Sequence, residues 1–169
     1  MLEAAGLSSP CPVHANPLTG LVSLSLPLPV RFRRETLAGQ AVSLLSFPGL
    51  AHVVSTASLP DRETLSSLLP ELARSMDVPA VQWDRWDPVQ RSLTAFRMHQ
   101  DGTLTEEAAS LSGFAAAALG TARGEGTHKL EWPHSSGSVH AAVTVHHGTF
   151  QRLLLTVPVL PGQEYEISF

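Results

Sequence analysis

The sequence has 169 residues and a mass of 18.1 kDa, the size of one domain with a substantial core. Its net charge of -4, from 11 basic and 15 acidic residues, argues against a nucleic-acid partner, because a phosphate backbone needs a basic surface. Charged residues make up only 15% of the chain and hydrophobic residues 43%, which predicts apolar surface that a partner would cover.

The single cysteine, Cys11, excludes an internal disulfide and a cysteine-rich zinc site, and it fits a reducing compartment. The longest apolar stretch, residues 41–54, contains Pro48 and His52 and is shorter than a membrane-spanning helix, so we expect no membrane contact. The first basic residue is Arg31, and a signal peptide would begin with positive charge. We therefore expect a cytoplasmic protein.

The first part of the chain predicts an irregular lead-in followed by strands. Residues 1–20 are rich in proline and glycine, which disfavour regular hydrogen-bonded structure. The next segment alternates apolar and polar residues until Pro27 and Pro29, and predicts a short or edge strand. Two runs rich in valine and leucine, on either side of a Pro-Gly turn, predict a buried strand pair. These three strands are expected at residues 21–30, 40–47 and 51–56.

The middle of the chain predicts one helix and two further strands. Apolar residues recur every three or four positions from Leu65 to Met76, as on one face of an amphipathic helix. Pro70 lies inside this pattern and should break or kink the helix. The two strands are expected at residues 80–83 and 93–98, with a turn at residues 84–88.

The last third predicts a second helix of unusual composition. Residues 112–122 are small and apolar on every side, and a helix without a polar face belongs inside a core. The segments after it alternate as strands do, with glycine- and serine-rich turns between them. These strands are expected at residues 129–132, 139–146, 150–157 and 164–169. Five to nine strands around one buried helix make an α+β fold, with residues 21–169 in a single domain.

The segment that leads into this helix resembles a known family. Residues 109–113 read Ala-Ser-Leu-Ser-Gly, where the diaminopimelate epimerases open a helix with Ala-Cys-Gly-Thr-Gly. Residues 49–52 read Gly-Leu-Ala-His, similar to the Gly-Asn-Pro-His of that family, and residues 133–139 are similar to its Pro-Gly-Gly turn. The chain thus resembles the C-terminal half of the superfamily of diaminopimelate epimerase, proline racemase and the phenazine-biosynthesis-type isomerases.

The resemblance implies a diaminopimelate-epimerase-like half-domain, in which a curved, mostly antiparallel or mixed sheet wraps around the alanine-rich helix. It implies an isomerase of the racemase or epimerase type, which transfers a proton at the α-carbon of an amino acid or related small acid without a cofactor. One half supplies one wall of the site, so a second copy in a homodimer, or a separate complementary chain, would complete it.

The resemblance also assigns roles to six residues. Ser110 stands where the family has a catalytic cysteine, at a helix start that favours negative charge and binds carboxylates. The candidate catalytic residues are Glu106, Ser110 and His52, and the candidate substrate-binding residues are Ser112, Gly113 and Gly49.

Three departures from the family pattern support an alternative function. Ser110 is a far weaker acid than cysteine, Leu111 replaces a glycine beside the carboxylate, and Leu50 replaces a substrate-binding asparagine. The alternative is a non-enzymatic half-domain that binds a partner or a small ligand. For the protein as a whole, the resemblance implies a small carboxylate-bearing ligand as partner.

Each candidate residue also has a structural interpretation. Ser110 and Ser112 suit a helix N-cap, Glu106 and Glu107 suit the positive end of a helix dipole, and His52 suits a hydrogen-bonded core position. No cysteine cluster and no His-x-x-x-His pattern is present, so we expect no metal site.

Overall fold

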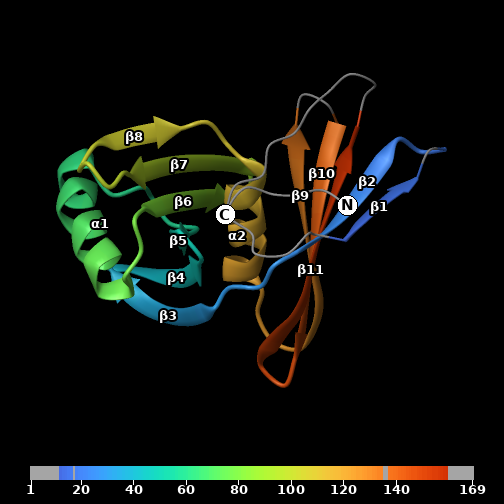
Figure 1. Ribbon diagram of the computed structural model, residues 1–169, viewed down its shortest axis with the longest axis horizontal. Helices are drawn as coiled ribbons and strands as arrows, with labels where there is room; N and C mark the ends of the chain where they lie inside the picture. Colours follow the sequence, from blue (N-terminus) through green and yellow to red (C-terminus); the bar gives the residue numbers. More distant parts are fainter. Residues whose placement is uncertain (1–11, 17, 135–136, 160–169) are drawn as a thin grey trace.

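The computed structural model describes residues 12–16, 18–134 and 137–159. Within these residues the chain forms two helices and eleven strands, which make two sheets. Figure 1 shows four layers in the order helix α1, six-stranded sheet, helix α2 and five-stranded sheet. The alanine-rich helix α2 contacts strands of both sheets, so it lies between them.

The five-stranded sheet has the order β1-β2-β11-β10-β9, and every neighbouring pair is antiparallel. Strand β2 pairs with both β1 and β11, so the segment predicted as a short or edge strand is short but internal. Strand β1 lies in the segment predicted to be irregular. The strands are β1 (Val13–Asn16), β2 (Leu21–Leu26), β9 (Gly126–His134), β10 (Gly137–His146) and β11 (Thr149–Pro158).

The six-stranded sheet has the order β3-β4-β5-β6-β7-β8 and is mixed. Its pairs are antiparallel except β5 and β6, which are parallel because helix α1 connects them. The strands are β3 (Arg31–Leu37), β4 (Gln40–Phe47), β5 (Leu50–Ser55), β6 (Val81–Asp87), β7 (Ser92–Met98) and β8 (Leu104–Glu107).

Helix α1 (Arg62–Met76) covers the face of the six-stranded sheet that points away from α2. The Asp61 side chain caps it by accepting a hydrogen bond from the Thr64 N–H at 2.7 Å. This bond lowers the pKa of Asp61, because it favours the charged carboxylate. Asp77, in the left-handed conformation with φ 54°, ends the helix.

The helix continues through Pro70, so the predicted break is wrong. Pro70 removes one backbone hydrogen-bond donor. Burial of Leu65 and Leu69 before it, and of Leu72 and Met76 after it, holds both parts of the helix on the sheet. Tertiary packing therefore outweighs the local preference of the proline.

Helix α2 (Leu111–Thr121) is buried on every side, as its composition predicts. A Cβ atom on Gly120 would lie 2.7 Å from the Cβ of Val54 on β5, so only glycine permits this close approach. Side chains from the sheet and the following loop satisfy the carbonyls at its C-terminal end. Ser43 donates to the Gly120 carbonyl at 2.7 Å, Arg123 donates to the same oxygen at 2.6 Å, and Arg34 donates to the Ala122 carbonyl at 2.6 Å.

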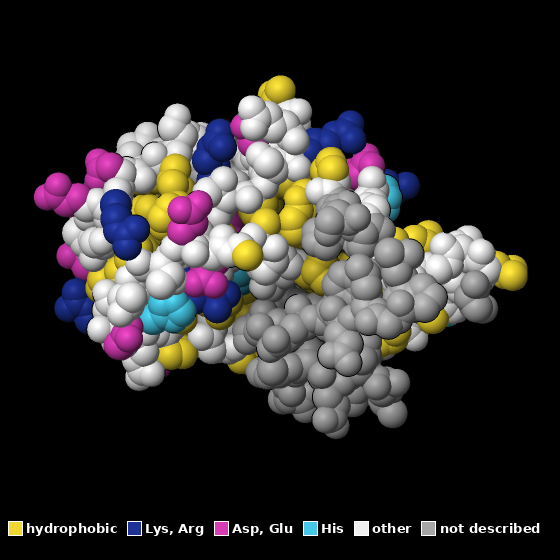
Figure 2. All heavy atoms as spheres, turned by 90° about the horizontal axis from the view of Figure 1, so that it is seen from above, with side chains coloured by type: hydrophobic (Ala, Val, Ile, Leu, Met, Phe, Trp, Pro, Cys, Tyr) yellow, Lys and Arg dark blue, Asp and Glu magenta, His cyan; other side chains and the backbone are white. Residues whose placement is uncertain are grey.

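The α+β prediction is confirmed, but the strand count was too low. Eleven strands form two sheets in the described residues, where five to nine strands around the helix were predicted. The predicted strand at residues 164–169 and Cys11 lie outside the described residues. In the described part of the chain, neither helix is long and apolar enough to cross a membrane. Acidic and basic side chains are interspersed on the face shown in Figure 2.

Candidate binding site at the start of helix α2

Strand alternation places three polar side chains on the face of the six-stranded sheet that meets α2. His52 lies between Ala51 and Val53 on β5, and those two neighbours belong to the core beneath α1. Gln82 and Asp84 flank Trp83 on β6 in the same way. His52, Gln82 and Asp84 are all 0% exposed. Buried polar groups of this kind need hydrogen-bond partners.

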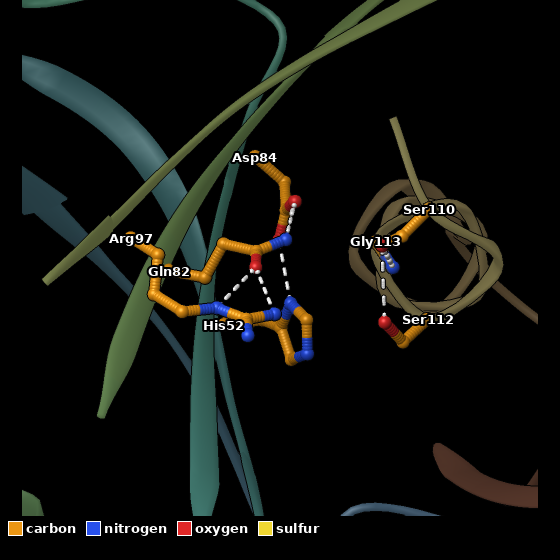
Figure 3. A network of polar contacts seen from close by, with 7 residues as sticks. All are labelled: His52, Gln82, Asp84, Arg97, Ser110, Ser112 and Gly113. Carbon is orange, nitrogen blue, oxygen red and sulfur yellow. Dashed lines mark hydrogen bonds and ion pairs between the residues drawn. The ribbon is translucent and has the colours of Figure 1, made fainter. Parts of the chain in front are cut away.

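The three side chains form a hydrogen-bonded chain with Arg97 of β7 (Figure 3). His52 Nδ1 lies 2.6 Å from Asp84 Oδ2, and Gln82 Nε2 donates to Asp84 Oδ1 at 2.6 Å. Arg97 donates from Nε and Nη2 to Gln82 Oε1, at 3.0 and 2.7 Å. Asp84 thus accepts two short bonds within the core.

The order of these bonds fixes the protons of His52. A guanidinium only donates, so the amide oxygen of Gln82 must face Arg97 and its NH₂ group must face Asp84. A carboxylate only accepts, so Nδ1 of His52 must carry a proton toward Asp84. When His52 is neutral, its Nε2 atom therefore holds a lone pair; when His52 is protonated, Nε2 becomes a donor.

His52 Nε2 is a buried atom with no hydrogen-bond partner among the residues that the structure describes. Figure 3 shows the imidazole beside the Asp84 carboxylate, on the face of the sheet that is turned toward the start of α2. The ring of Phe47 packs edge-on against it, with ring centres 5.8 Å apart. A buried polar atom without a partner is costly, so this atom marks a place where a further polar group would be stabilising.

The start of α2, which faces the same side of the sheet, offers hydrogen-bond donors. Ser110 is the N-cap: its Oγ accepts from the Gly113 N–H at 3.1 Å and its carbonyl accepts from the Phe114 N–H at 3.0 Å. The N–H groups of Leu111 and Ser112 have no acceptor among the residues that the structure describes. The Ser112 hydroxyl lies 3.1 Å from that of Ser110. Free N–H groups at the positive end of a helix favour an anion.

The close approach of helix and strand depends on glycine. A Cβ atom on Gly113 would lie 2.8 Å from Asp84 Oδ1 and 3.2 Å from Gln82 Nε2. The Gly113 position therefore brings the first turn of α2 against the buried chain, which a larger residue would push away.

The polar face continues toward the edge of the sheet through Glu107. Thr105 donates to Glu107 Oε1 at 2.5 Å, and His99 Nε2 lies 3.5 Å from the same oxygen. The hydrogen bond from Thr105 has the largest effect and lowers the pKa of Glu107; burial opposes it, and the nearby Arg97 charge adds a smaller lowering. An ionised Glu107 thus lies near the exposed end of the chain that leads to His52.

The structure brings four of the six candidate residues together and separates two. His52, Ser110, Ser112 and Gly113 meet at the start of α2. Glu106 is exposed and is paired with Phe96, which packs on the α1 side of the sheet, so it faces away from the site.

Gly49 is an exposed turn residue between β4 and β5, with φ 87°, and it contributes a conformation that favours glycine.

Sequence analysis missed Gln82, Asp84 and Arg97. Residues 84–88 were predicted as a turn, yet β6 runs to Asp87 because Trp86 is 1% exposed and packs on Phe114, with ring centres 5.6 Å apart. The alternation of Val81 and Trp83 with Gln82 and Asp84 was the available signal, since it predicts two polar residues on one face of a longer strand.

The site is closed in this structure. Ser112 is 4% exposed and His52 is 0% exposed, while Ala108 and Ala109, in the connection that leads from β8 to α2, are exposed. No group of acidic, histidine or cysteine side chains that could hold a metal ion occurs among the described residues. A scan against family models finds no match to the sequence, and a search of curated proteins finds no similar protein.

Proposed function

We propose that this protein binds a small carboxylate at the start of α2, as a non-enzymatic half-domain. The observation that carries the proposal is the buried Nε2 atom of His52, which has no partner among the described residues and belongs to a side chain on the sheet face turned toward α2. The N–H groups of Leu111 and Ser112 are the expected donors to one ligand oxygen. The Ser112 hydroxyl and His52 Nε2 are the expected partners of the other.

Binding of a carboxylate at this place should take up a proton. A neutral His52 presents a lone pair to the ligand, and a lone pair repels an anion. A proton on Nε2 converts this repulsion into a charge-assisted hydrogen bond, while Asp84 on the other side of the ring stabilises the imidazolium.

Proton transfer at the α-carbon is the second candidate function, because His52 held by Asp84 resembles the histidine–carboxylate pairs that serve as general bases. Two-base transfer also requires an acid on the opposite face of the substrate. Glu106 faces the other side of the sheet, and the Ser110 hydroxyl is engaged as the helix cap. These placements favour binding without turnover.

A titration with acetate tests the proposal. The protein is labelled with ¹⁵N-histidine, and the NMR signals of His52 are identified by their loss in the variant His52→Gln. Glutamine is chosen because its amide can still form a hydrogen bond to Asp84. Acetate should shift these signals saturably and acetamide should not. His99→Gln is the matched control, since His99 is half-buried at the sheet edge and should leave the titration unchanged. Absence of a saturable shift at high acetate concentration would contradict the proposal.

Hydrogen exchange separates the two candidate functions. A panel of amino and hydroxy acids is incubated with the protein in deuterium oxide, and incorporation at the α-carbon is measured by NMR. We expect none. Incorporation that His52→Gln abolishes would establish proton transfer instead.

The second half implied by the family resemblance belongs to the same proposal. The exposed Ala108 and Ala109 beside the half-buried Ser110 are the surface over the site, and a second copy or a complementary chain would cover it there. Light scattering at increasing concentration tests the homodimer, and a monomer at high concentration would leave only a separate chain as the partner.

A further inference from the structure

A second cavity lies on the outer face of the five-stranded sheet, remote from His52. Its volume is about 640 Å³, within the usual range of small-molecule sites. It is formed by the connection between β6 and β7 together with strands β9, β10 and β11. The residues that line the cavity include Trp86, Arg91, Lys129, Glu131, Ala142 and Leu154.

The pairing of the strands sets an apolar row across the cavity floor. Ala142 of β10 is paired with Lys129 of β9 on one side and with Leu154 of β11 on the other. These three residues therefore lie side by side on one face, opposite to the core residues Ala141 and Leu155. The positively charged Lys129 lies at one end of the row, and the half-buried Leu154 lies at the other.

The arginine and the lysine of the cavity differ in their partners. Arg91 is paired with Glu131, its Nη1 atom lying 2.8 Å from Glu131 Oε2. A hydrogen bond from Ser138 lowers the pKa of Glu131, and the charges of Arg91 and His140 lower it further, so Glu131 remains an anion that neutralises Arg91. Lys129 is the single lysine of the sequence, and its side chain has no ion pair or hydrogen bond among the described residues. The ammonium group of Lys129 is thus left for a ligand.

We propose that this cavity is a site for a small amphipathic carboxylic acid, with its carboxylate paired to Lys129 and its apolar body on Ala142 and Leu154. Trp86 and Pro88 form the wall on the side of the β6–β7 connection. The cavity shares no residue with the start of α2. The two proposals therefore stand or fall separately.

The single lysine makes a direct test possible. Reductive methylation with ¹³C-formaldehyde labels the Lys129 amine and the chain N-terminus, and it keeps the positive charge. Titration with 3-phenylpropionate should shift the Lys129 signal saturably. The alcohol 3-phenylpropanol lacks the charge, and propionate lacks the aromatic body. Each should therefore bind at least about fivefold more weakly than 3-phenylpropionate. Equal affinity for the acid and the alcohol would overturn the proposal.

Variants identify the site independently of the label. Binding of 3-phenylpropionate, measured by calorimetry, should weaken about fivefold in Lys129→Met and also in Leu154→Ser. Arg152→Met is the matched control, because Arg152 is an exposed cation on β11 outside the cavity. Circular dichroism verifies that each variant is folded. Wild-type affinity in folded Lys129→Met, or a loss as large in Arg152→Met, would refute the assignment.

Discussion

Replacement of Asp84 by asparagine should reverse the protons of His52 while the fold is kept. Arg97 holds the oxygen of Gln82, so the Gln82 NH₂ group must still find an acceptor at position 84. In Asp84→Asn only the amide oxygen can serve, and the introduced NH₂ group then faces His52 Nδ1. Nδ1 must accept this bond, so the proton of a neutral His52 moves to Nε2.

The cost in stability follows from the number of bonds that survive. Asp84→Asn keeps two hydrogen bonds but makes both neutral, which should cost about 1–3 kcal/mol. Asp84→Ala leaves two buried donors, on His52 and Gln82, without an acceptor, and should cost about 2–6 kcal/mol. Glu106→Gln is the exposed control and should stay within about 0.5 kcal/mol of wild type. Urea unfolding measures all three.

Asp84→Asn should not lose acetate binding. With a permanent N–H at Nε2, Asp84→Asn should bind acetate at neutral pH at least as tightly as wild type, without proton uptake. Calorimetry in two buffers with different ionisation enthalpies measures the uptake, and ¹⁵N-histidine spectra report which nitrogen of His52 carries the proton. An unchanged tautomer of His52, or proton uptake equal to that of wild type, would refute the inference that Arg97 fixes the Gln82 amide and so the proton of His52.

Three further predictions concern stability. Gly120→Ala should cost about 1–3 kcal/mol in urea unfolding because its Cβ meets Val54, and the added change Val54→Ala should recover part of that loss; no recovery would argue against the contact. Pro70→Ala should stabilise the protein by about 1–2 kcal/mol, because α1 already runs through this position; a lower unfolding midpoint would contradict this. Glu107→Gln should lower the free energy of unfolding at neutral pH, because a carboxylate whose pKa is lowered in the folded state stabilises that state above the usual glutamate range. The difference in unfolding free energy between variant and wild type should vanish as acid protonates the carboxylate. An equal difference at about pH 3 would contradict this prediction.

The parts of the fold that depend on local pattern were predictable. The composition of residues 112–122 alone predicts a buried helix, and the helix is buried. The division of the strands into two sheets was not predictable in this way, because pairing such as that of β2 with β11 joins residues more than a hundred positions apart. Pro70 shows the same limit for helices, since burial of its neighbours decided the outcome.

The candidate site shows how a shift of one residue changes a prediction. Glu106 and Glu107 are the same type of residue and are neighbours in the sequence. On a strand only one of two neighbours can face α2, and here it is Glu107. Asp84 was hidden for a different reason. Its partner His52 lies 32 positions away, and no local signal joins a residue of β5 to one of β6.

The position of Asp84 explains why an anion site beside it should depend on a proton. The carboxylate is buried without a cation in direct contact: its bonds come from His52 and from Gln82, whose amide relays the Arg97 charge. The first turn of α2 approaches so closely that a Cβ on Gly113 would touch Asp84, so the positive end of the helix already stabilises this charge. A ligand carboxylate would be a second anion at the same helix end. Two anions there require a second positive charge, and the imidazole hydrogen-bonded to Asp84 is the group that can acquire it.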